Sequence, residues 1–385
     1  MPLTVLFDLD ETLLSTHMDR FLPLYFDLLG QTLSHLGHQE TIVSQIHTAV
    51  EMMVANRDPA KTLKEVFDEN FYPQLGTTKE ACQPILDAFY QQQYPRIKSV
   101  VQARPESPEL VKWCLSEGMS VAIATNPLFP HTATYQRIQW SGLDPKDFEL
   151  FTAYDDFHFT KPNPAYYAEI LGRVGWPEMP AVMIGDNPSD DLIPMDTFGF
   201  ETFWIKQENQ RTSWKGGDLV DVKSWLQQVI HTPRRSPISD PWVNIATLRA
   251  TPAVFDTWIR AKPVWEPNVL KNPPKTRVVE ALNSLIWCEE QVHLNLLNES
   301  MLESICDFTI HQSPSLGEHL NREDHSAHEV LAHFIAARKS TLSQFEKFIL
   351  NASKGQDEKS AQTVNDFLYQ IADHDRQLLR QIVNL

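Results

Sequence analysis

The sequence of 385 residues contains no apolar run of about 18 residues, the length that a membrane-spanning helix needs. No basic region or cleavage site precedes its first apolar stretch, which argues against export. The few cysteines, at positions 82, 114, 288 and 306, form no Cys-x-x-Cys pair and therefore predict neither a disulfide framework nor a zinc knuckle. We expect a cytoplasmic protein with reduced thiols.

Positive charge is also scarce. Lys and Arg number 33 against 50 Asp and Glu, which gives a formal net charge of -17. Such a balance repels nucleic-acid backbones and anionic lipid, so we expect neither nucleic acid nor membrane as a partner. Residues 1–232 carry -14 of this charge, and any cation-binding site is therefore expected in that part of the chain.

The chain is longer than the about 250 to 300 residues at which single cores stop growing, which predicts two domains. Eight prolines occur between positions 230 and 274, and apolar periodicity is lost around residues 233–237. We expect a first domain over residues 1–231, a linker over 232–241 and a second domain over 242–385.

The two domains differ in their patterns. Residues 3–7, 120–124, 181–184 and 202–205 are short apolar runs separated by helical segments. This alternation predicts an α/β fold, a Rossmann-like doubly wound parallel sheet with helices on both faces. A helical insertion over residues 16–96 interrupts it after the first strand. The second domain shows helical patterns alone, over residues 278–297, 327–350 and 361–383, and is predicted to be an all-α bundle.

Two carboxylates follow the first predicted strand, in the run Phe-Asp-Leu-Asp-Glu-Thr over residues 7–12. Strand alternation directs Asp8 and Asp10 to the same side. Like charges this close need a compensating partner, so the pair indicates either a metal site or an acid and a nucleophile with separated pKa values. A solvated turn after the strand is the alternative.

Further acidic side chains follow the strand at 181–184. Asp186 comes directly after it, and Asp190 and Asp191 lie in what we expect to be the first turn of a helix. Together with Asp8 they provide the hard oxygen ligands that Mg²⁺ prefers, and they are few enough to leave room for water and a substrate phosphate.

A hydroxyl and a cation complete the pattern. Thr125, followed by Asn126, ends the strand at 120–124, and Lys161 precedes another predicted helix. A donor and a positive charge at the ends of strands suit the oxygens of a phosphoryl group in transfer.

These four signals, in their order along the chain, resemble the motifs of the haloacid dehalogenase superfamily of phosphatases and phosphotransferases. The resemblance covers residues 1–230, and the insertion is similar to the helical cap that some members carry after the first motif. It implies that Asp8 is the nucleophile and forms an aspartyl-phosphate, and that Asp10 protonates the leaving oxygen and then activates water.

The same resemblance implies roles for the other positions. Thr125 and Lys161 would bind the phosphoryl oxygens, together with Asn126. Asp186 would ligate Mg²⁺ directly with Asp190 or Asp191 assisting, and the spacing leaves that choice open. Asp8 and the backbone of Asp10 would complete the metal site.

The expected activity is hydrolysis of a small phosphorylated metabolite with Mg²⁺ as cofactor. Asp10 favours this over carbon–halogen cleavage, because dehalogenation needs no proton for its leaving group. A phosphomutase, or a ligand-sensing regulatory protein on the same scaffold, is the alternative. Cap contacts are sought near His17, Met18, Asp19 and Arg20, whereas Tyr25 has the helical spacing of a core residue. We expect the acidic stretch over residues 154–158 to be a solvated loop.

Residues 242–385 resemble a DinB-like four-helix bundle. The positions that match that family's three metal-binding histidines are Ser284, His374 and Leu378. One imidazole cannot close a metal site, so we expect a non-catalytic bundle that serves a homo-oligomer or a protein partner. A retained metal-dependent activity of the DinB-like type is the alternative. His325, His328 and His333 are interpreted as surface residues.

Overall fold

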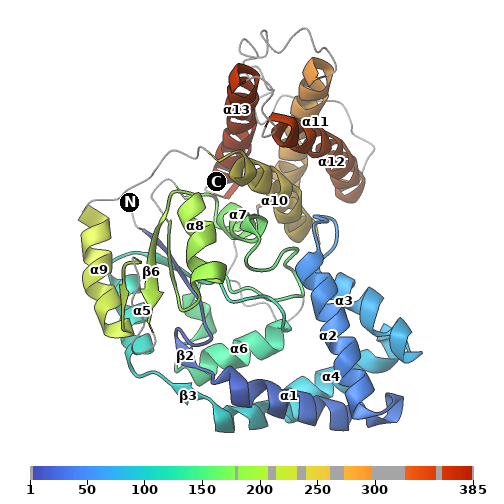
Figure 1. Cartoon of the computed structure of the whole chain (residues 1–385), viewed down its shortest axis with the longest axis vertical. Coiled ribbons are helices and arrows are strands. Elements are labelled where there is room, and N and C mark those ends of the chain that lie inside the picture. Colours follow the sequence, from blue (N-terminus) through green and yellow to red (C-terminus); the bar gives the residue numbers. More distant parts are fainter. Residues whose placement is uncertain are drawn as a thin grey trace. The chain divides into compact units, whose positions relative to one another are not determined.

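A computed structural model describes residues 3–177, 181–206, 214–231, 240–260, 273–296, 326–352 and 358–383 (Figure 1). The chain divides into two compact units. Unit 1 comprises Met1–Asn163, Met179–Asp196 and Phe200–Arg235, and unit 2 comprises Pro164–Glu178, Thr197–Gly199 and Ser236–Leu385. The expected linker over residues 232–241 lies largely outside the described residues.

Unit 1 is built on a parallel sheet with the strand order β4-β1-β5-β6-β7. The strands are β1 (Thr4–Phe7), β4 (Ser120–Ile123), β5 (Ala181–Gly185), β6 (Glu201–Ile205) and β7 (Gly216–Gly217). The first four are the strands expected from the apolar runs. Their burial explains the absence of alternation in the sequence, because a parallel sheet covered on both faces selects apolar residues throughout.

Helices of unit 1 cover the sheet. Helix α5 (Glu106–Ser116) packs on β4, α9 (Leu219–His231) packs on β6, and the two helices contact each other. Helix α6 (His131–Trp140) follows β4, and the short η4 (Pro145–Asp147) comes next. After β5 the chain makes a π-helical turn, η5 (Pro188–Leu192), and continues into α8 (Ile193–Thr197).

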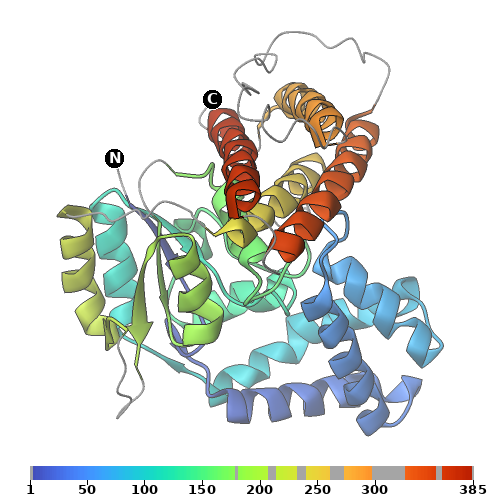
Figure 2. The same ribbon diagram turned by 45° about the horizontal axis from the view of Figure 1, so that its top comes forward.

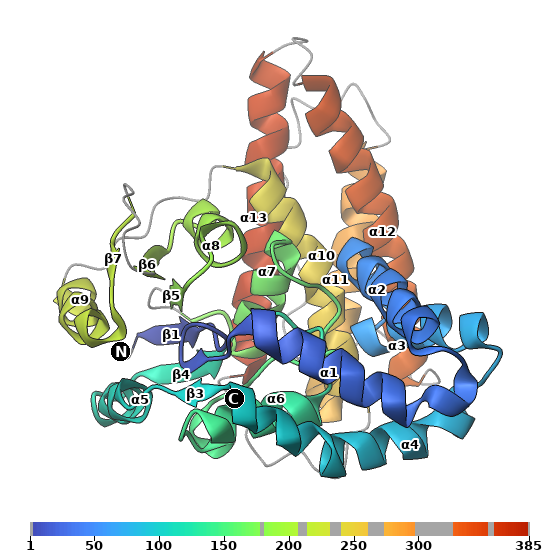
Figure 3. The same cartoon turned by 60° about the horizontal axis from the view of Figure 1, so that its bottom comes forward.

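The insertion after β1 is a helical cap. It begins and ends at an antiparallel pair of short strands, β2 (Leu14–Ser15) and β3 (Gln102–Ala103). Between them lie α1 (Met18–Thr32), η1 (Ser34–Leu36), α2 (Gln39–Ala55), α3 (Leu63–Phe71), η2 (Pro73–Leu75), α4 (Lys79–Gln92) and η3 (Tyr94–Val100). Figure 3 shows α1 and α4 running side by side, with α2 and α3 paired beyond them.

Local sequence explains where these cap helices begin. Thr62 and Glu65 form a capping box at the start of α3, with each side chain accepting a hydrogen bond from the other residue's backbone N–H. Thr78 caps α4 by accepting one hydrogen bond from the N–H of Ala81. Such caps satisfy backbone donors that have no partner inside the helix.

The elements described in unit 2 are helices. Its long helices are α10 (Pro241–Ile259), α11 (Lys275–Leu296), α12 (Ala327–Ala352) and α13 (Glu358–Val383), the yellow-to-red ribbons of Figure 2. The last three are the helices that the periodicity predicts. None of the helices in the described parts of the chain is long and apolar enough to cross a membrane.

A fifth helix, α7 (Pro164–Arg173), packs with this bundle although it lies far earlier in the sequence. It contacts α10 and α13, and every residue from Ala165 to Arg173 is buried. Gly172 allows the close approach, because a Cβ there would lie 2.8 Å from a methyl carbon of Val254. The bundle is therefore completed by a helix that lies earlier in the sequence, before β5 of the sheet.

The bundle also contains a buried network of charges. Arg338 on α12 donates hydrogen bonds to both carboxylate oxygens of Asp375, at 2.7 and 3.2 Å, and to Glu289. Thr251 donates to Asp375 at 2.6 Å, and Thr341 donates to Glu289. All five side chains are almost fully buried.

The histidines of unit 2 and the positions matched to metal-binding histidines can be placed in part. His328 and His333 are exposed as expected, and His325 lies outside the described residues. Ser284 and Leu378 are buried, and His374 Nε2 lies 4.0 Å from Cys288 Sγ.

Candidate active site

Asp8 follows β1 at the carboxyl end of the sheet. Its backbone N–H donates to the carbonyl of Ile184 at 2.9 Å and so continues the pairing of β1 with β5. The residue is 6% exposed, and one carboxylate oxygen accepts a hydrogen bond from Lys161 Nζ at 2.7 Å. The sheet thus fixes the backbone of Asp8, and Lys161 orients its carboxylate.

Asp186 and Asp191 come to the same edge from the neighbouring strand. Trp204 Nε1 donates to the Asp186 carbonyl at 2.7 Å and holds the chain where it leaves β5. The N–H of Asn187 donates to Asp191 at 3.0 Å, which turns that carboxylate back toward the strand. Gly185 is required there, since a Cβ would lie only 2.2 Å from an oxygen of Asp191.

Lys161 lies between two of these carboxylates. Its Nζ donates to Asp191 at 2.6 Å in addition to Asp8. One ammonium group therefore serves a cluster of three carboxylates, which leaves an excess of negative charge at a buried edge of the sheet.

The pKa values reflect this excess. Burial raises the pKa of Asp8 well above its ordinary value, Lys161 opposes the shift, and repulsion from Asp191 and Asp186 adds to it. Burial, followed by repulsion from Asp191, raises the pKa of Asp186 to about 7. Burial and mutual repulsion thus outweigh the one ammonium group of Lys161 in the cluster.

A divalent cation fits this cluster. Asp8, Asp186 and Asp191 each offer an oxygen, and these oxygens lie within 4.8 Å of one another. Mg²⁺ holds its oxygen ligands at about 2.0 to 2.1 Å, so ligands on opposite sides of the ion are about 4.2 Å apart and small side-chain rotations would suffice. Among the described residues this is the one group of three potential ligands of this kind.

Asp190 is placed differently from Asp191. It is partly exposed, and its carboxylate accepts a hydrogen bond from Asn187 Nδ2 at 3.1 Å. The π-helical turn η5 directs Asp191 inward and leaves Asp190 at the rim. The sequence left this choice open, and the geometry favours Asp191 as the ligand.

Asp10 has partners that differ from those of Asp8. Thr16 Oγ1 donates to it at 2.6 Å and Thr125 Oγ1 at 3.4 Å. Arg137, on α6, donates to the oxygen that Thr125 also contacts. Sequence reasoning missed Arg137, because a single arginine within a helix gives no signal that distinguishes a buried partner from a surface charge.

The other expected phosphoryl ligands lie nearby in the chain. Thr125 is buried, and its carbonyl accepts a hydrogen bond from Thr152. The Oδ1 atom of Asn126 is buried without a hydrogen-bond partner among the described residues. This oxygen can accept a hydrogen bond from a ligand, and a donor to a phosphoryl oxygen would have to be the Nδ2 group of the same amide.

Residues at the start of the cap are partly as expected. Tyr25 is buried and shares a hydrogen bond of 2.9 Å with Tyr90, so it is a core residue. His17 has a left-handed backbone, with φ of 53°, and its N–H donates to Glu11 at 2.5 Å. Met18, Asp19 and Arg20 form the first turn of α1.

The solvated loop expected over residues 154–158 is a wrong prediction. Tyr154, Phe157 and His158 are buried. The backbone N–H of Leu63 donates to the Phe157 carbonyl at 2.7 Å, so the segment is covered by the cap. Its acidic composition hid three aromatic residues that pack inward.

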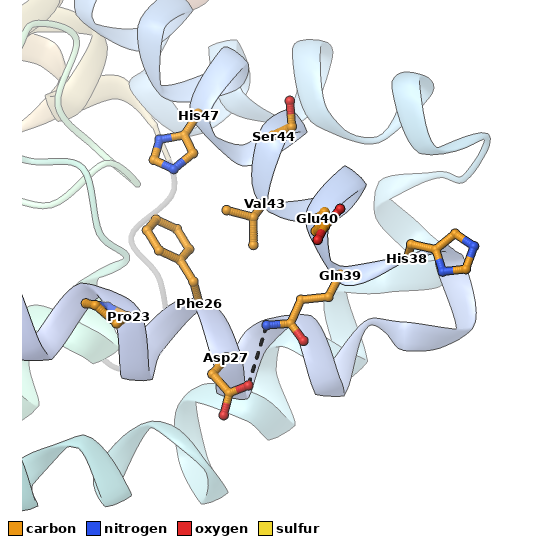
Figure 4. A pocket seen from close by; sticks show the side chains of 9 residues that line it. All are labelled: Pro23, Phe26, Asp27, His38, Gln39, Glu40, Val43, Ser44 and His47. Atoms are coloured by element: carbon orange, nitrogen blue, oxygen red, sulfur yellow. Dashed lines mark hydrogen bonds between the residues drawn. The ribbon is translucent and has the colours of Figure 1, made fainter.

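The cap has a cavity of about 1050 Å³ between α1 and α2 (Figure 4). Phe26 and His47 face each other across it, and Asp27 and Gln39 are joined by a hydrogen bond. None of the carboxylates at the sheet edge lines this cavity.

Comparison with known proteins identifies the family. The family model of haloacid dehalogenase-like hydrolases matches residues 3–195. The chain therefore belongs to the haloacid dehalogenase-like hydrolase family. The match ends before the C-terminal helices, whose resemblance to DinB-like bundles stays a prediction.

Solved structures resemble part of the chain. A phosphatase of this family from Thermococcus onnurineus is 22% identical, with a TM-score of 0.38 over 59% of this chain and 98% of its own. A 2-haloacid dehalogenase from Pseudomonas syringae pv. Tomato DC3000 is 20% identical, with a TM-score of 0.42 over 59% and 99%. The L-2-haloacid dehalogenase from Xanthobacter autotrophicus is 13% identical, with a TM-score of 0.36 over 60% and 100%.

No curated protein matches the chain significantly. Of the three solved structures, one is named a phosphatase and two are named haloacid dehalogenases. The reaction of this chain is therefore argued from its own residues.

Proposed function

We propose that the protein is a Mg²⁺-dependent phosphohydrolase that acts on a small phosphorylated metabolite through an aspartyl-phosphate on Asp8. The observation that carries the proposal is the position of Asp8: it belongs to a carboxylate cluster short of positive charge and is held by Lys161 at 2.7 Å. A cation would relieve that shortage and would at the same time attract the negatively charged phosphoryl group to Asp8.

The first half of the reaction transfers the phosphoryl group to Asp8. A carboxylate oxygen of Asp8 forms the new bond to phosphorus. The bond from phosphorus to the leaving oxygen breaks, and its electron pair stays on that oxygen, which takes a proton from Asp10. Lys161 and Thr125 would bind the phosphoryl oxygens, with Asn126 as a further donor.

The second half releases phosphate. A water oxygen bonds to phosphorus as the bond to Asp8 breaks, and the proton of the water passes to Asp10. When bound by Asp8, Asp186 and Asp191, Mg²⁺ would supply charge stabilisation to the phosphoryl oxygens.

Asp10 supports phosphoryl transfer over dehalogenation. A halide leaves without a proton, whereas the alkoxide released from a phosphate ester needs one. A regulatory protein that only senses a ligand would need neither Asp10 nor a nucleophile.

The test is a phosphate-release screen over sugar phosphates, phosphoglycolate, nucleotides and phosphoamino acids, with Mg²⁺ or with chelator. We expect wild-type protein to release phosphate from at least one class with Mg²⁺ alone, and Asp8→Asn to be inactive. Asp147→Asn, an exposed aspartate of η4, is the matched control and should retain activity. No release from any class, or equal activity of Asp8→Asn, would refute the proposal.

The same assay separates a phosphomutase from a phosphatase. A hydrolase turns over with water as the sole acceptor. A mutase would require a phosphorylated acceptor for more than one turnover.

A further inference from the structure

Arg137 is a buried cation that the proposed reaction has not yet used. Its side chain is 1% exposed, and its guanidinium lies over the ring of Phe129 at 4.7 Å from the ring centroid. A charge in such surroundings is costly unless a counter-charge compensates it. The carboxylate bonded to Arg137 is that of Asp10.

The environment of Arg137 is otherwise poor in partners. One terminal nitrogen donates to Asp10 and the other to Thr134 Oγ1 at 3.3 Å. The Nε atom is buried without a hydrogen-bond partner among the described residues. A guanidinium chosen for stability alone would have more of its donors satisfied, so its placement points to the carboxylate that it holds.

Asp10 is held at a junction between the cap and the sheet. Thr16 Oγ1, which donates to Asp10 at 2.6 Å, lies just after β2, where the chain enters the cap. Arg104, just after β3, donates to the carbonyl of Glu11 at 2.9 Å. Both ends of the cap are thus tied to the segment that carries Asp10.

Aromatic residues of the cap pack against those of the segment that carries Arg137. Phe129 lies edge-on to Phe21 and Tyr25 of α1, with ring centroids 5.9 and 5.3 Å apart. Tyr94 of η3 stacks on Trp140 of α6 at 5.4 Å. The position of the Arg137 guanidinium is therefore fixed by the packing of the cap against α6.

We propose that Arg137 is a positioning residue that orients the Asp10 carboxylate for proton transfer to the leaving oxygen and makes that orientation dependent on the seating of the cap. This inference rests on the proposed function. It assigns Arg137 no contact with substrate: Asp10 gives up the proton, and Arg137 holds one oxygen of the Asp10 carboxylate in place.

Two substrates with different leaving groups test this role. An alkyl phosphate needs its leaving oxygen protonated, whereas p-nitrophenyl phosphate releases a stable anion. Since a positioned acid contributes about 10²- to 10⁴-fold, Arg137→Met should lower kcat for the alkyl phosphate by about 10²-fold. The loss for p-nitrophenyl phosphate should be less than about tenfold, and KM should change little for either substrate.

Control variants separate positioning from packing. Gln136, the neighbouring residue on α6, donates to the carbonyl of Tyr90 in the cap at 2.8 Å and does not contact Asp10. Gln136→Leu should therefore affect both substrates equally. In an Asp10→Asn background, Arg137→Met should cause no further loss, because the two residues act as one unit.

Every outcome bears on the inference. Equal losses for the two substrates, or additive losses in the double variant, would overturn it while leaving the phosphohydrolase proposal intact. Wild-type protein that releases phosphate from neither these two substrates nor any class in the screen would refute the proposed function and the inference with it. If Arg137→Met does not fold, Arg137→Lys keeps the charge with a different geometry, and it must show the same selective loss for the alkyl phosphate.

Discussion

The described residues include a cluster of buried charge at the sheet edge of unit 1 and another in the bundle of unit 2. In the bundle, Arg338 is bonded to two carboxylates, those of Glu289 and Asp375. Threonine hydroxyls occupy further carboxylate oxygens. At the sheet edge, Lys161 serves a cluster of three carboxylates.

The pKa values show how the clusters differ. Burial alone would lower the pKa of Arg338, but Asp375 and Glu289 outweigh burial and raise it. At the sheet edge the carboxylates carry the shift instead, and the pKa of Asp186 rises to about 7. The bundle cluster is complete within the protein, whereas the sheet-edge cluster needs a further positive charge. Carboxylates with pKa values perturbed in this way are typical of functional sites.

The largest expected effect concerns the bundle cluster. Arg338→Met leaves two buried carboxylates without their cation and should lower the free energy of unfolding by about 3 to 5 kcal/mol. Urea denaturation measures this loss. Lys347→Met, an exposed position on the same helix, should change it little. Equal stability of the Arg338 variant and wild type would contradict the idea that the cluster is structurally complete.

The sheet-edge cluster should respond to Mg²⁺. At about 100 times the dissociation constant, a ligand that binds the folded state alone adds about 2.7 kcal/mol to the free energy of unfolding. We expect Mg²⁺ to raise the Tm of wild-type protein and of Asp190→Asn, but not of Asp186→Asn or Asp191→Asn. A Mg²⁺ response that survives Asp186→Asn, or that is lost in Asp190→Asn alone, would contradict the ligand assignment.

The smallest expected effect is a pH dependence of Tm that comes from Asp155, a carboxylate outside both clusters. Burial raises the pKa of Asp155 to about 6, although the N–H of His131 donates to it at 2.6 Å and opposes the shift. A raised folded-state pKa contributes stability below the unfolded value of about 4, and this contribution is lost as pH rises through about 6. Asp155→Asn should therefore lose less Tm than wild type between these pH values. Parallel Tm profiles for the two proteins would contradict this.

Much of the fold could be predicted from the sequence. The four runs that became β1, β4, β5 and β6 are apolar throughout, and this is the signature of strands buried on both faces. Asp8 and Asp186 follow two of these runs directly, so parallel neighbours bring them together. The helical cap followed from a change of period.

Other features depend on tertiary structure. The inward turn of Asp191 depends on a π-helical turn capped by Asn187, which spacing alone does not specify. The role of Arg137 depends on the packing of the cap against α6. The membership of α7 in the bundle had one local signal, because residues 165–171 are apolar on nearly every side of the helix.

The proposed reaction requires Asp8 to take up a phosphoryl group with the help of a cation at the sheet edge. The protein can be incubated briefly with a substrate that it hydrolyses, with Mg²⁺ or with chelator, then quenched with acid and analysed by intact mass spectrometry. We expect one added phosphoryl group, located on the peptide that contains Asp8, in the samples with Mg²⁺ and not in those with chelator. Phosphate release without any such adduct in rapidly quenched samples, or an adduct on another residue, would contradict it.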